Sequence, residues 1–176
     1  MRDTLRSITA DDYLGDLTGL EMAELRSRRA ACREVETGLS YLRREAQGRL
    51  DVVAAERARR DAGTEGDLED LIARLPELLA GSTRSPGTGR LPSEFGTGAI
   101  DEDLAVELDR IVSESHLSEL DRLTDEQLAA VATSLERFER TVSDLRRTLF
   151  DRIDAIETEL TRRYRTGEAS VDSLLP

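Results

Sequence analysis

Residues 32–53, CREVETGLSYLRREAQGRLDVV, decide the fold of this chain. From Cys32 to Ala46, apolar residues recur at steps of 3, 4, 3 and 4, which is the repeat of a coiled-coil seam. The same repeat returns later in the chain at Leu128, Val131, Leu135, Phe138, Val142, Leu145, Leu149, Ile153, Ile156 and Leu160. Long helices with one apolar stripe must pack on each other or on a partner. The sequence therefore predicts an all-α fold.

Helix-start signals precede both seams. Thr18 and Thr124 are each followed three residues later by Glu or Gln, which is the pattern of a capping box. A glycine ends each pattern, which gives long helices over residues 18–63 and 124–167. We expect them to form an antiparallel two-helix coiled-coil hairpin.

The remaining sequence predicts connecting and terminal segments. Residues 64–115 are expected to be a linker with short amphipathic helices, at 68–79 and at 101–113. Between these helices, residues 81–98 are rich in Gly, Ser, Thr and Pro without periodicity, as in a flexible linker. Residues 168–176 are expected to be a disordered tail.

The composition excludes several classes of function. A net charge of −12 argues against direct DNA binding through a broad basic surface. With Cys32 as the single Cys and His116 as the single His, we expect no metal site and no catalytic site. No apolar run reaches the roughly 20 residues of a membrane span, and we expect a cytoplasmic protein.

The two predicted helices share polar residues as well as a seam. At an offset of 103 residues, Arg49 matches Arg152 and Glu56 matches Glu159, identities that a seam does not require. On the first helix, one narrow polar stripe beside the seam holds Glu36, Ser40, Arg43, Gln47 and Asp51. The matching residues of the second helix are Glu139, Ser143, Arg146, Phe150 and Asp154. We expect the two stripes to line one shallow groove of an antiparallel hairpin.

This set of side chains suits a guanine nucleotide. A carboxylate accepts hydrogen bonds from the N1–H and N2–H₂ edge of guanine, and Arg binds guanine O6 and N7 or a phosphate. Arg43 and Arg146 are the best candidates for this role, and the neighbouring Arg44 and Arg147 are candidates for a phosphate. A solvated helix face with ion pairs between successive turns is the alternative interpretation.

The first stripe, Glu36-x₃-Ser40-x₂-Arg43-x₃-Gln47-x₃-Asp51, resembles the signature of the RsiG family of actinobacterial anti-sigma factors. The second copy keeps four of the five positions and has Phe150 where the pattern has Gln. The resemblance covers both long helices, which are about half of the chain. Because Phe150 removes a hydrogen-bonding group, we expect the two half-sites to be unequal.

The resemblance implies a binding switch. RsiG-like proteins bind two molecules of cyclic di-GMP across the two motifs of a helical hairpin. In that state they withhold a sporulation sigma factor of the WhiG type from RNA polymerase. An acidic chain is a suitable partner for the basic surfaces of a sigma factor. The alternative is a structural coiled-coil adaptor that homodimerises without nucleotide, and an enzyme is a more distant third.

Overall fold

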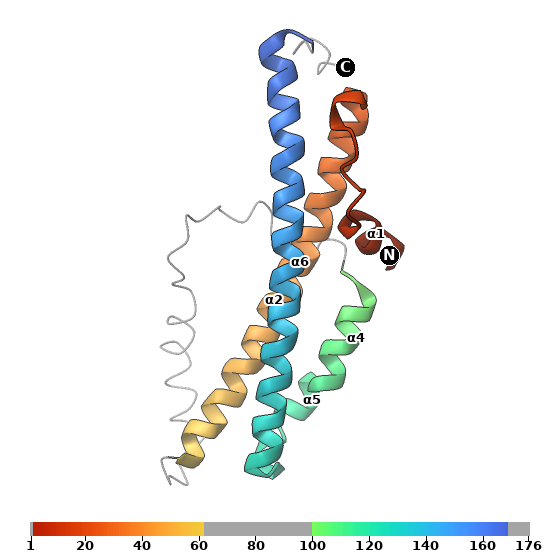
Figure 1. Ribbon diagram of the computed structural model, residues 1–176. Coiled ribbons are helices and arrows are strands. Elements are labelled where there is room, and N and C mark those ends of the chain that lie inside the picture. Colours follow the sequence, from red (N-terminus) through yellow and green to blue (C-terminus); the bar gives the residue numbers. More distant parts are fainter. Residues whose placement is uncertain (1, 62–99, 169–176) are drawn as a thin grey trace. The chain divides into compact units, whose positions relative to one another are not determined.

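A computed structural model describes residues 2–61 and 100–168 (Figure 1). The expected helix at 68–79, the expected flexible linker at 81–98 and residues 169–176 of the expected tail lie outside these ranges. The described elements are α1 (Arg2–Thr9), a 3₁₀ turn η1 (Leu17–Gly19), α2 (Met22–Asp61), α4 (Glu102–Ile111), α5 (Glu114–Leu117), a second 3₁₀ turn η2 (Leu120–Arg122) and α6 (Asp125–Thr166). No strand occurs in the described ranges, and the all-α prediction is confirmed.

The described part of the chain divides into two compact units. Residues 2–42, 100–103 and 141–168 belong to the first unit, and residues 43–61 and 104–140 belong to the second. Each unit contains a part of α2 and a part of α6. The two units are described separately below.

In both units α2 and α6 run antiparallel. In the first unit, Arg26 binds the Tyr164 hydroxyl, and Glu36, further along α2, binds Arg146, which is earlier in α6. In the second unit, the partner in α6 likewise moves from Glu139 to Asp125 as α2 advances from Arg43 to Arg60. The predicted helical hairpin is therefore confirmed.

Seam residues of α2 and α6 make up most of the core of each unit, and Leu108 of α4 joins them in the second unit. In the first unit the largest fully buried side chains are those of Leu25, Cys32, Leu39, Val142, Leu149 and Ile156. In the second unit they are those of Val53, Leu108, Leu128 and Leu135. Three expected seam residues, Leu50, Val131 and Leu145, are only half-buried. Residues of the short elements complete the cores. Ile8 of α1 is buried in the first unit. In the second unit, Val112 at the end of α4 and Leu120 of η2 are buried.

The two expected capping boxes differ in outcome. Before α6, the Thr124 N–H donates to Gln127 Oε1 at 2.8 Å and the Gln127 N–H donates to Thr124 Oγ1 at 3.2 Å, so this capping box is confirmed. The expected start at Thr18 is wrong. Asp16 caps η1 instead, because its carboxylate accepts hydrogen bonds from the N–H and the hydroxyl of Thr18. Helix α2 accordingly begins at Met22.

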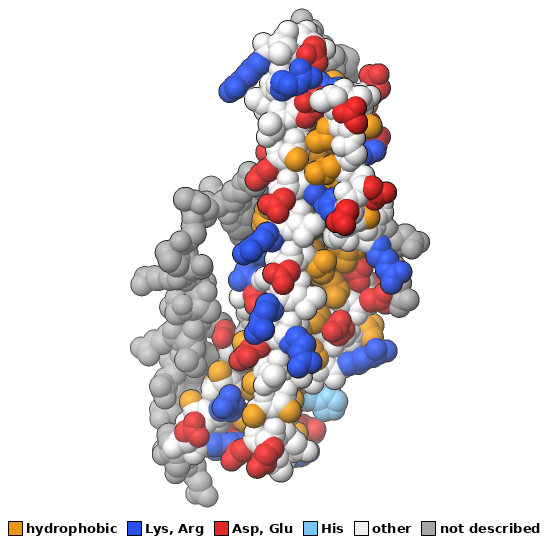
Figure 2. All heavy atoms as spheres, viewed as in Figure 1, with side chains coloured by type: hydrophobic (Ala, Val, Ile, Leu, Met, Phe, Trp, Pro, Cys, Tyr) orange, Lys and Arg blue, Asp and Glu red, His pale blue; other side chains and the backbone are white. Residues whose placement is uncertain are grey.

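Charges of both signs are mixed over the surface. Figure 2 shows Arg side chains interspersed with Asp and Glu side chains on the face in view. Within residues 2–61 and 100–168, no helix is long and apolar enough to cross a membrane. The same residues contain no group of three or more His, Cys, Asp or Glu side chains that could hold a metal ion.

Candidate functional site

The predicted stripe on α2 lies along the border between core and solvent. All five of its side chains are half-buried: Glu36, Ser40, Arg43, Gln47 and Asp51. On α6, the equivalent residues Glu139, Ser143, Arg146 and Phe150 are also half-buried, whereas Asp154 is exposed. This position follows from the sequence, since each stripe residue comes directly after a seam residue.

In the first unit, a cluster forms around the carboxylate of Glu36, which belongs to α2. Oxygen Oε1 of Glu36 accepts hydrogen bonds from Arg146 Nε at 3.1 Å, from Arg146 Nη2 at 2.9 Å and from Ser40 Oγ at 2.6 Å. The Arg146 guanidinium also lies over the ring of Phe150, at 5.4 Å from the centroid. We name Glu36, Ser40, Arg146 and Phe150 the first-unit cluster.

In the second unit, the equivalent cluster forms around Glu139 of α6. Oxygen Oε1 of Glu139 accepts a hydrogen bond from Arg43 Nε at 2.7 Å, and Gln47 Nε2 lies 3.4 Å from the same oxygen. We name Arg43, Gln47 and Glu139 the second-unit cluster. Each cluster therefore combines the Glu of one motif with the Arg of the other.

The two Arg–Glu pairs differ in their exposure to solvent. The side chains of Arg146 and Glu36 are 20% and 18% exposed, whereas those of Arg43 and Glu139 are 34% and 24% exposed. A less solvated pair is screened less by water and salt. The first-unit pair is therefore the more firmly held of the two.

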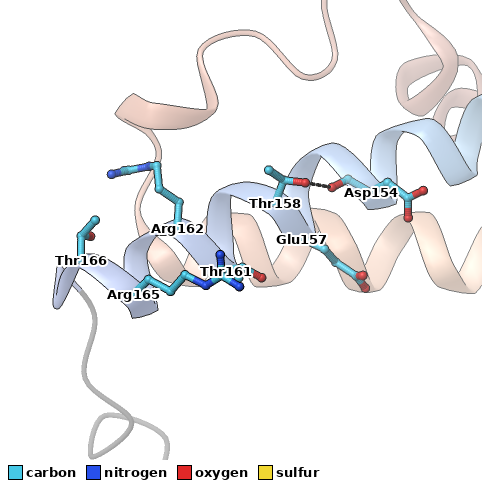
Figure 3. Close-up of a pocket in the computed structure, with 7 residues that line it drawn as sticks. All are labelled: Asp154, Glu157, Thr158, Thr161, Arg162, Arg165 and Thr166. Carbon is cyan, nitrogen blue, oxygen red and sulfur yellow. Dashed lines mark hydrogen bonds between the residues drawn. The ribbon is translucent and has the colours of Figure 1, made fainter.

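The two Asp residues of the motifs are placed differently. Asp51 makes no hydrogen bond or ion pair within the described part of the chain, and burial raises the pKa of its carboxyl above the usual value. Asp154 lies at an open cleft of about 630 Å³ along the last turns of α6, where its backbone oxygen accepts a hydrogen bond from Thr158 (Figure 3). Glu36, Ser40 and Arg146 do not line this cleft, so the cleft is separate from the first-unit cluster.

The two candidate phosphate ligands lie free at the surface. Arg44 and Arg147 are both exposed. Neither forms a hydrogen bond or an ion pair with any residue in the described ranges. Both guanidinium groups are therefore available to an anion.

A second set of Arg residues holds backbone oxygens. Arg49 donates to the carbonyl of Val112 at 2.7 Å, and Arg152, 103 residues later, donates to the carbonyl of Thr9 at 2.9 Å. The two acceptors are also 103 residues apart. These contacts tie α2 to the end of α4 and α6 to the end of α1.

The 3₁₀ turns are held in the same way. Arg60 donates to the carbonyls of Leu120 and Leu123, and Arg163 donates to those of Leu17, Thr18 and Leu20. Both guanidinium groups are also bonded to a Glu one turn earlier, Glu56 or Glu159. The matches of Arg49 with Arg152 and of Glu56 with Glu159 were visible in the sequence. The carbonyl contacts of Arg49 and Arg152, and the ion pairs of Glu56 and Glu159 with the arginines that hold the turns, were not visible, because a backbone acceptor leaves no mark in the sequence.

Comparison with known proteins identifies one family. A family model described as RsiG-like matches residues 11–79 and 114–176, which together make up most of the chain. The matched ranges include both clusters and both arginine-held turns. No curated protein matches the chain.

Proposed function

The chain belongs to the RsiG-like family, which suggests an anti-sigma role, and from that premise we propose that it is an anti-sigma factor controlled by cyclic di-GMP. In this proposal, the first-unit and second-unit clusters bind the guanine nucleotide, with two ligand molecules per chain. The liganded protein captures a sporulation sigma factor of the WhiG type and withholds it from RNA polymerase. It acts in the cytoplasm of an actinobacterium, by binding and without catalysis.

The observation that carries the proposal is the pairing of Arg with Glu from opposite helices at two equivalent places. Glu36 pairs with Arg146, and Arg43 pairs with Glu139. The two Glu residues are 103 residues apart in the sequence, and so are the two Arg residues. Each pair places a guanidinium beside a carboxylate, and these are the groups that recognise the two hydrogen-bonding edges of guanine. Asp51 adds a partly buried carboxylate without a partner in the described residues.

The charge balance supports local recognition of the ligand. Cyclic di-GMP carries two negative charges, and a chain with a net charge of −12 repels it at long range. Binding must therefore come from positive groups at the site itself. Arg44 and Arg147, exposed beside Arg43 and Arg146, supply positive charge that is not already paired within the described ranges.

The structure also bears on the alternative function, a structural coiled-coil adaptor that homodimerises without nucleotide. An adaptor of this type would use dimerisation to cover its apolar seams. Here most of the described seam residues are already buried within one chain, among them Leu39, Val53, Leu135 and Ile156. This removes the main physical reason for a homodimer.

The test is a capture assay with the purified candidate sigma factor, with and without cyclic di-GMP, together with titration of the chain alone. We expect capture only in the presence of ligand, at two ligands per chain. Arg57→Ala is a suitable control, because Arg57 is exposed on α2 and has no partner in the described ranges. Equal capture in both conditions would keep the anti-sigma role and remove the second messenger. If the chain neither captures the sigma factor nor binds the nucleotide, the proposal as a whole is contradicted.

A further inference from the structure

The short helices α1 and α4 are anchored at equivalent places in the two units. The carbonyl oxygen of Thr9, the last residue of α1, accepts a hydrogen bond from Arg152. The carbonyl oxygen of Val112, directly after α4, accepts one from Arg49. Because each helix has the same kind of anchor, a buried arginine bonded to a main-chain oxygen, the remaining contacts decide how firmly each helix is held.

The two anchors differ in the charge beside them. Arg49 also forms an ion pair with Asp109 of α4, at 2.8 Å between Nη1 and Oδ1. The residue of α1 that is equivalent to Asp109 is Arg6, which is exposed and whose side chain has no partner in the described ranges. The anchor of α1 therefore lacks the carboxylate that strengthens the anchor of α4, and a second cation stands at the equivalent position.

The two helices also differ in the apolar side chains that they bury. Leu108 and Val112, in and directly after α4, are 2% and 4% exposed. The equivalent residues of the first unit are Leu5 and Thr9, and both are only half-buried. Among the described side chains of α1, Ile8 alone is buried. Since the free energy of docking grows with the apolar area that is buried, α1 is held less firmly than α4.

The chain that follows α1 is held by contacts of its own. The carbonyl oxygen of Tyr13 accepts a hydrogen bond of 2.6 Å from Arg28 Nη1. The guanidinium groups of Arg28 and Arg152 lie 5.4 and 5.7 Å from the centroid of the Tyr13 ring, which favours cation–π attraction. The Tyr13 hydroxyl lies 3.9 Å from Sγ of Cys32. A movement of α1 can therefore pivot between Thr9 and Tyr13 and leave Cys32 covered.

We propose that α1 is a strap that detaches from the first unit and docks again while α2, α4 and α6 remain folded. Its detachment breaks the hydrogen bond between Arg152 and Thr9 and exposes Ile8. Detachment of α4 would break an equivalent hydrogen bond, and would also break an ion pair and expose two core side chains. The movement requires neither nucleotide nor sigma factor, so it goes beyond the proposed function and is tested independently of it.

The test is hydrogen–deuterium exchange of the full chain at neutral pH, followed by mass spectrometry of peptides that contain α1 or α4. The protection factors of the hydrogen-bonded amides in α1 should be at least about tenfold lower than those in α4, which is the effect of burying one apolar side chain fewer. Labelling of Cys32 by DTNB should remain slow in the same sample, because Tyr13 stays in place. Equal protection of the two helices, or rapid labelling of Cys32, would overturn the proposal.

Two reciprocal variants test the physical cause. Arg6→Asp supplies the missing carboxylate and should raise the protection factors of α1 about two- to fivefold, the effect of one partly exposed ion pair. Asp109→Arg should lower those of α4 by at least the same factor. Arg57→Asp is the matched control for Arg6→Asp, because it makes the same change in net charge at an exposed residue of α2 without a partner in the described ranges. The proposed cause is wrong if these two Arg→Asp variants alter the exchange of α1 equally.

Discussion

Arg152 donates a hydrogen bond of 2.9 Å to the carbonyl oxygen of Thr9, and so ties the middle of α6 to the last residue of α1. Arg152 is only 7% exposed, and its Nε has no hydrogen-bond partner among the described residues. A buried cation with one unsatisfied donor is costly, so the side chain remains folded inward only because the contacts of its terminal nitrogens and its packing compensate. The equivalent Arg49 shows the same combination of burial, a carbonyl acceptor and an unsatisfied Nε.

We predict that Arg152→Met lowers the free energy of unfolding by about 1–3 kcal/mol, because the carbonyl of Thr9 loses its charged donor. Urea denaturation followed by circular dichroism measures this change. Arg147→Met is the control, since Arg147 is exposed and has no partner in the described ranges; it should change stability by less than about 0.5 kcal/mol. Equal stability of the two variants would show that the anchor contributes nothing.

Acid should weaken the contacts that hold η1. Hydrogen bonds from Arg162 and Arg163 lower the pKa of the Glu159 carboxyl from 4.5 to about 2. A carboxyl with a lowered folded-state pKa stabilises the fold above its unfolded pKa, and this contribution is lost as the pH falls toward the folded value. Thermal unfolding measured between pH 5 and pH 2 should therefore lose stability more steeply in the wild-type chain than in Glu159→Gln. Parallel profiles would rule out this source of acid sensitivity.

Substitution of a cluster residue should affect ligand-dependent capture of the sigma factor more than it affects the stability of the fold. Arg43→Ala and Asp51→Ala should each abolish capture of the sigma factor and leave the helical circular dichroism spectrum unchanged. The Arg43–Glu139 pair is partly exposed, so a double-mutant cycle on stability should give a coupling of only about 0.2–1 kcal/mol. Normal capture by either Ala variant would remove that residue from the ligand site.

Cys32 should be chemically inert in the folded chain. Its side chain is fully buried, and burial raises the pKa of its thiol above the usual value. A thiol reagent such as DTNB at pH 8 should label Cys32 only slowly in buffer and completely in denaturant. Rapid labelling of the native protein would show that the first-unit core opens readily.

How far the sequence predicts this molecule depends on the kind of contact. The seam and the Thr124 capping box are local patterns, so they predict the helices and the antiparallel hairpin correctly. Thr18 has the same pattern as Thr124, yet it lies in η1, because Asp16 competes for its N–H and hydroxyl. The sequence could not distinguish these outcomes, since both use the same short-range hydrogen bonds.

The contacts of the candidate site could not be predicted from the sequence, because they depend on how two helices pack. The stripe residues were identified from spacing alone, but the partner of each Arg depends on the register between α2 and α6. That register pairs Glu36 with Arg146 and Arg43 with Glu139, which no spacing within one helix specifies. The carbonyl contacts of Arg49 and Arg152 were missed for a related reason, because an Arg beside a seam looks the same whether it faces solvent or a buried backbone oxygen.

The way in which Arg60 and Arg163 hold the two 3₁₀ turns has a consequence for substitution. Their acceptors in the turns are main-chain carbonyls, which every amino acid provides. Side chains at Thr18 and Asp121 can therefore be exchanged without loss of the Arg contact, whereas replacing either arginine leaves several carbonyls without their donor. The connections into α2 and α6 can thus acquire new surface chemistry while the backbone path stays the same.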